Sequence, residues 1–292
     1  MPHTAHTAHA RLRAAYTGEH ITAARQGVGH IGDLGLDRCT VPQQRLRTLL
    51  ATYLFGGAVA GTSIVSRLTH YSLTMSPRID DLVVVTDCPT NVLGYLVPSG
   101  EETGAAGLPG LRLNQADGNE TYRLVHLPTG ARMTVTDQHR GVFDDARFGV
   151  YSRDTGDGYR WWTPDVPLHA TEQHMLRFNP VPSKGVAAIL RALAMRLDAR
   201  DIAGRWAIGH WFSDPLQRPK PTNFHYFRQR RLVGAGRRWL LQWDSYPYPQ
   251  DLVSMLLDET IGLPGMTATE AGKAYDLHLN GHILRIQSSL DR

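Results

Sequence analysis

The sequence predicts an α+β fold built from two diverged tandem repeats related by a pseudo-two-fold axis, with an N-terminal helical arm. Three observations support this prediction. Val-Pro pairs at 41–42 and 181–182 each open an apolar run, and these runs end at the same offset on His70-Tyr71 and His210-Trp211. A Gly-Leu-Pro-Gly string then follows in each half, at 107–110 and at 262–265. Because the matches keep the same order, we expect both halves to fold as one type of unit.

The chain length agrees with this division, since 292 residues correspond to two domains of roughly 100–200 residues each. We expect an arm and linker over 1–40, a first repeat over 41–139, a bridging segment over 140–180, and a second repeat over 181–292. Each repeat is predicted to have the order α–β(3)–α–β-hairpin. The second repeat is the richer in tryptophan and arginine, because all six tryptophans follow residue 160.

The helices are predicted from apolar spacing and from their first and last residues. Residues 8–26 form a helical arm that Thr17-Gly18 divides into two short helices. Proline suits the first helical turn, so helices begin after Pro42 and after Pro182, and leucines recur there at three- and four-residue steps. Shorter helices are expected over 90–96 and 251–260.

The strands are predicted from alternating or β-branched runs. In the first repeat these runs are 63–72, 81–86, and a hairpin over 121–136. In the second repeat they are 205–212, 224–233, 237–243, and a hairpin over 274–288. Asn280-Gly281 suits the tight type I′ turn of the last hairpin.

Composition limits the functional classes. Only three of the 31 basic residues are lysine, a bias typical of a high-GC, actinobacterial genome. The net charge of +4 permits an anionic partner. No apolar run is long enough for a membrane span, and the N-terminus lacks the pattern of a secretory leader, so we expect a soluble, cytoplasmic protein that does not bind membranes.

The leading functional hypothesis is non-catalytic binding of nucleic acid by a hairpin in the second repeat. Arginines and aromatic rings alternate there, and such surfaces hold phosphates while rings stack on bases. The candidate residues are Tyr226, Arg228, Arg230, Arg231, Arg237, Arg238 and Trp239. The sequence leaves open whether the ligand is DNA or RNA, and it leaves the oligomeric state open.

Two alternatives stand beside this hypothesis. The chain is an enzyme, of hydrolase type, if His210 acts with Asp214 and Asp244 in a tryptophan-lined cleft as acid, base or metal ligand. His70 is the equivalent of His210 in the first repeat, and a structural role for both histidines is equally open. The chain is a protein–protein adaptor if the segment 9–30 docks on a partner. No metal-site spacing and no catalytic signature is present, and the sequence leaves open whether the protein binds a cofactor.

Overall fold

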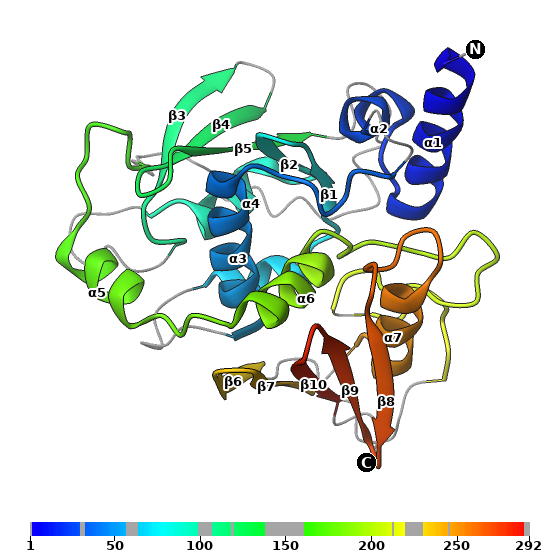
Figure 1. Ribbon diagram of the computed structural model, residues 1–292. Coiled ribbons are helices and arrows are strands. Elements are labelled where there is room, and N and C mark those ends of the chain that lie inside the picture. The colour runs from blue at the N-terminus through cyan, green and yellow to red at the C-terminus, as the bar shows by residue number, and fades with distance from the viewer. Residues whose placement is uncertain are drawn as a thin grey trace.

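The structure is a computed structural model that describes residues 2–29, 33–56, 64–98, 107–117, 120–137, 161–211, 213–219, 230–244 and 246–288. It confirms the α+β class. Two five-stranded sheets of mixed strand direction form the outer layers, and helices α3 (Val41–Gly56) and α6 (Lys184–Ala194) lie between them (Figure 1). We name the part from α3 to the last strand of the first sheet unit 1, and the part from α6 to the last strand of the second sheet unit 2.

Unit 1 follows α3 with a short 3₁₀ helix and a sheet that one further helix interrupts. Its strands pair in the order β1-β2-β5-β4-β3, and only β2 and β5 run parallel. The elements are η1 (Val65–His70), β1 (Thr74–Pro77), β2 (Asp81–Thr86), α4 (Pro89–Leu96), β3 (Leu111–Asp117), β4 (Thr121–His126) and β5 (Ala131–Asp137).

Unit 2 repeats this arrangement. Its strands pair in the order β6-β7-β10-β9-β8, and again only the second and fifth strands in chain order, β7 and β10, run parallel. The elements after α6 are β6 (Arg231–Ala235), β7 (Arg238–Trp243), α7 (Pro249–Leu257), β8 (Thr267–Ala271), β9 (Ala274–Leu279) and β10 (His282–Ser288).

The two Gly-Leu-Pro-Gly strings occupy the same structural position. Each follows the second helix of its unit, and the leucine N–H donates to a carbonyl near that helix's end: Leu108 to Leu96 at 2.8 Å, and Leu263 to Leu256 at 2.9 Å. A Cβ atom on Gly107 would lie 2.5 Å from the Leu96 carbonyl oxygen. The first glycine is therefore required by close backbone approach.

A single hydrophobic core joins the two units. Helices α3 and α6 pack on each other, and the Phe55 ring of α3 lies 5.3 Å from the ring of Trp211 in unit 2. Trp211 in turn lies 5.4 Å from Trp243 on β7. Buried residues of both units belong to one contiguous cluster, so each unit completes the other's core.

The N-terminal arm consists of α1 (Pro2–Thr17) and α2 (Ile21–Gly27), with the break at Gly18 as expected. Within the arm, Arg13 and Glu19 form a fully buried ion pair at 2.7 Å. Arg13 also donates to the Pro77 carbonyl at the end of β1. The arm is thus folded and packed on the chain's own body.

The bridging segment contributes helix α5 (Ala170–Phe178), which a second buried pair attaches to unit 1. Arg112 of β3 donates to both carboxylate oxygens of Glu172, at 2.7 and 2.9 Å, and both side chains are fully buried. Glu172 also accepts from the Gly110 N–H and from the N-cap backbone N–H of its own helix. One carboxylate therefore fixes the start of α5 and the turn before β3.

Two strand predictions were wrong. Residues 65–70 form a 3₁₀ helix, because Val65 and Leu68 are buried at a three-residue step rather than by alternation. Residues 205–211 form only one isolated bridge, between Ala207 and Arg200. Gly204 and Gly209 have φ values of 70° and 56°, which extended strands do not accommodate.

The predicted order of helices and strands within each unit was also incomplete. Each terminal hairpin carries a further strand, β3 in unit 1 and β8 in unit 2, and the short strand β1 was not predicted. The helices expected over 90–96 and 251–260 are present as α4 and α7, both with proline in the first turn. No helix among the described residues is long and apolar enough to cross a membrane.

Candidate functional site

The hairpin of β6 and β7 separates its side chains onto two faces. Arg231 pairs with Gln242 and Ala235 with Arg238, so both arginines lie on the same face of the sheet. Both are exposed. The alternate residues Leu232, Trp239 and Leu241 are buried against the core. Alternation along the strands therefore places the cations in solvent and the large apolar groups inside.

Three arginines of this hairpin form what we term the arginine face: Arg231, Arg237 and Arg238. Arg237 lies in the turn between β6 and β7, and all three are exposed. None of them forms an ion pair with a carboxylate among the described residues. The charges of Arg231 and Arg237 are therefore available to an anionic partner, while the charge of Arg238 also acts on Asp276.

The structure assigns two other predicted binding residues to structural positions. Trp239 is 4% exposed, and its Nε1–H donates to the Gly236 carbonyl of the turn. The Arg230 guanidinium lies 4.7 Å from the Trp211 ring centroid and donates to the carbonyls of Leu54 and Ser66 in unit 1. Burial lowers the pKa of Arg230 to about 9. Arg230 therefore links the units, while Tyr226 and Arg228 lie outside the described residues.

The equivalent face of unit 1 differs in charge. Arg123 of β4 pairs with Asp117 at 3.4 Å, and Arg132 of β5 pairs with Asp80. On that face each of these arginines has an acidic partner, so its field is largely neutralised. The equivalent strands of unit 2, β9 and β10, also carry a pair, Asp276 with Arg285, so the difference between the sheets lies in the exposed arginines of the β6–β7 hairpin.

No hydrogen bond or ion pair among the described residues joins the three predicted catalytic residues to one another. Asp214 is 8% exposed and accepts from the side chain and backbone N–H of Arg218, while Arg218 also pairs with Asp251. This carboxylate closes a turn rather than facing His210. No hydrogen bond or ion pair joins Asp244 to His210 or Asp214 within the part of the chain that the structure describes.

His70 and His210 lie at the junction between the units. Burial lowers the pKa of both, to about 4 for His70, where the positive charges of Arg230, His210 and Arg67 contribute further. A backbone hydrogen bond also joins the two units at this junction, because the Trp211 N–H donates to the Thr69 carbonyl at 2.7 Å. Both imidazoles are therefore neutral at pH 7. His210 Nε2 lies 3.1 Å from the Ser213 hydroxyl.

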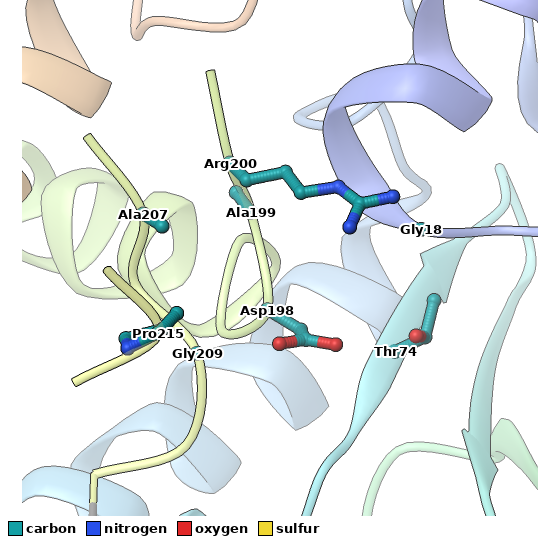
Figure 2. Close-up of a pocket in the computed structure, with 8 residues that line it drawn as sticks. All are labelled: Gly18, Thr74, Asp198, Ala199, Arg200, Ala207, Gly209 and Pro215. Carbon is teal, nitrogen blue, oxygen red and sulfur yellow. The ribbon is translucent and has the colours of Figure 1, made fainter. Parts of the chain in front are cut away.

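A cavity of about 270 Å³ lies where the arm, the edge strand β1 and the segment after α6 meet (Figure 2). Asp198, Arg200 and Thr74 are among the residues that line it. Burial raises the pKa of Asp198 to about 6, although the charge of Arg200 opposes this rise. The cavity brings together residues that are distant in the sequence.

Sequence reasoning missed Asp198 and Arg200. The only sequence signal is that two opposite charges interrupt the apolar stretch at the end of α6, and that signal is common on any helix end. No group of three or more His, Cys, Asp or Glu side chains within the described ranges is arranged to hold a metal ion.

Comparisons with protein-family models, with curated proteins and with solved structures return no match for this chain.

Proposed function

We propose that the protein is a non-catalytic binding protein that contacts nucleic acid through the arginine face of unit 2. The observation that carries the proposal is the exposure of Arg231, Arg237 and Arg238, none of which forms an ion pair with a described carboxylate. Phosphate contacts by arginine supply most of the affinity of sequence-independent binding, because each contact releases condensed counterions.

The side chains beside the arginine face favour backbone binding over base reading. Trp239 faces the core, and within the hairpin the residues around the arginines on the solvent face are Val233, Leu240 and Gln242. The neighbouring strands add the paired Arg285 and Asp276 to this face. Among the described residues, no aromatic ring lies on the solvent face of this hairpin, where it could stack on a base. We expect little dependence on nucleotide sequence.

A comparison of the units supports a related proposal about origin. The same strand order, the same single parallel pair and the same Gly-Leu-Pro-Gly turn argue that the chain is a diverged tandem duplication. Both outer faces carry paired charges, Arg123 with Asp117 and Arg132 with Asp80 in unit 1 and Arg285 with Asp276 in unit 2, but only unit 2 adds the exposed arginines of the β6–β7 hairpin. Divergence confined to one copy is the expected result when that copy acquires a binding role.

The test is a salt titration of binding to short DNA and RNA duplexes and single strands, followed by fluorescence anisotropy. We expect the triple variant Arg231→Gln, Arg237→Gln, Arg238→Gln to bind more weakly. On duplex DNA the slope of log K against log salt should become shallower by up to about 3, or about 0.9 for each lost phosphate contact.

The matched control is Arg123→Gln, which removes an exposed but paired arginine from the equivalent face of unit 1. Its slope should equal that of the unaltered protein. The proposal fails if the unaltered protein binds neither DNA nor RNA at low salt, or if the triple variant and the control have the same slope.

A further inference from the structure

The cavity at Asp198 has two opposite charges on one wall and a hydroxyl on the other. Figure 2 shows the Asp198 and Arg200 side chains leaving the same segment toward the cavity, with the Asp198 carboxyl directed toward Thr74 and Arg200 extending toward the turn at Gly18. The two charged groups are not within ion-pair distance of each other. Each therefore has capacity for another partner.

Hydrogen bonds fix the backbone segment that carries Asp198 and Arg200, both to the arm and to the following segment. The Arg200 N–H donates to the Tyr16 carbonyl of the arm at 2.9 Å, and the Ile208 N–H donates to the Ala199 carbonyl at 2.8 Å. The rings of Tyr16 and Trp206 stack at 6.3 Å beside these bonds. The wall is thus preorganised, which lowers the entropy lost when a ligand binds.

The polar groups of the cavity are incompletely satisfied. Neither the Asp198 carboxyl nor the Thr74 hydroxyl makes a hydrogen bond to any residue that the structure describes, and Thr74 is only 4% exposed. Asp198 is half-buried and its charge has no hydrogen-bond partner among the described residues, so an ammonium group at this position would form a charge-assisted hydrogen bond. Arg200 offers a fork of donors suited to a carboxylate.

We propose that this cavity binds a small zwitterion of the α-amino acid type, with its ammonium group on Asp198 and its carboxylate on Arg200. Thr74 adds a hydroxyl on the opposite wall. A volume of about 270 Å³ is below the roughly 300–1,000 Å³ of pockets for drug-sized ligands, which limits the occupant to a compact molecule. This site is separate from the arginine face, so it stands independently of nucleic-acid binding.

The test is calorimetric titration of the full-length protein with a panel of the standard L-α-amino acids. Each amino acid that binds is compared with its decarboxylated amine and its deaminated acid. We expect the amino acid to bind more tightly than either analogue. Asp198→Asn and Arg200→Gln should each raise its Kd at least about tenfold, since each removes a charge-assisted hydrogen bond.

The matched control is Arg25→Gln, an exposed arginine on α2 away from the cavity lining, which should leave the Kd unchanged. Circular dichroism confirms that each variant is folded. The proposal is overturned if no panel member binds, if the amine binds as tightly as its parent amino acid, or if Asp198→Asn binds as tightly as the unaltered protein.

Discussion

Asp198 illustrates how one half-buried carboxyl group couples the cavity to stability. Its pKa is raised from the ordinary 3.8 to about 6 by burial, and no described residue hydrogen-bonds to it. A group whose folded-state pKa is raised favours folding at low pH and loses that contribution as pH rises through the folded-state value. The ionised form therefore opposes folding above about pH 6.

Asp198→Asn should stabilise the protein at neutral pH. The amide resembles the protonated carboxyl, so the free energy of unfolding at pH 7 should rise by about 1–3 kcal/mol, and the difference should vanish below about pH 4. Urea unfolding at a series of pH values measures this. Equal midpoints for both proteins at pH 7 would contradict the burial argument.

Two histidines make the free energy of unfolding depend on pH in the opposite direction to Asp198. The variant must therefore be compared with the unaltered protein at every pH. Burial lowers the pKa of His70 and of His126 to about 4. Their contribution to stability is complete above the ordinary value of 6.5 and is lost as pH falls through about 4. The difference between the two proteins cancels this shared effect.

At the scale of elements, buried ion pairs attach the less regular segments to the sheets. Glu172 in the first turn of α5 pairs with Arg112 of β3. Arg13, which pairs with Glu19 inside the arm, also donates to the Pro77 carbonyl of β1. The members of both pairs are fully buried. Removing one partner of such a pair leaves the other charge without compensation in a low-dielectric environment.

Glu172→Gln should therefore lower the free energy of unfolding by about 3–5 kcal/mol. The measurement is urea unfolding followed by circular dichroism. Asp117→Asn is the control, because it breaks an ion pair whose arginine side chain is 60% exposed, and it should cost less than about 1 kcal/mol. A loss for Glu172→Gln no larger than that of the control would show that the pair does not anchor α5.

At the scale of the whole molecule, α3 and α6 make the two units dependent on each other. Leu54 and Phe55 of α3 are fully buried, Phe55 packs on Trp211, and the Leu54 carbonyl accepts from Arg230. Since one cluster of buried residues spans both units, we expect them to unfold together in a single transition.

Leu54→Ala tests this coupling. Deleting a buried leucine side chain should cost about 2–5 kcal/mol. The change lies in unit 1, whereas tryptophan fluorescence also reports on unit 2, through Trp206, Trp211, Trp239 and Trp243. The unfolding midpoint measured by fluorescence should nevertheless shift to the midpoint measured by circular dichroism. Val41→Ala, at an exposed position of the same helix, should change stability by less than about 0.5 kcal/mol. A fluorescence transition that Leu54→Ala leaves in place would indicate independent units.

The sequence by itself determined the features that depend on neighbours along the chain. The helices after Pro42 and Pro182, the break at Gly18, and the Asn280-Gly281 turn were predicted because local spacing, proline and glycine control backbone geometry over a few residues. The strings shared by the two halves also predicted two similar units, because equal local patterns lead to equal elements. At Val65 and Leu68, a three-residue step between apolar residues resembled partial alternation, so the local pattern wrongly predicted a strand.

The tertiary structure decided which charges are free and which are used. Three arginines of the β6–β7 hairpin face solvent, whereas the neighbouring Arg230 binds carbonyls of unit 1 that are more than 150 positions away. The cavity also depends on residues that are distant in the sequence, because Thr74 of β1 and the turn at Gly18 line it together with Asp198. The parallel pairs β2–β5 and β7–β10 likewise join distant segments. The physical reason is that burial and electrostatic pairing depend on distances in space, and residue spacing along the chain does not encode those distances.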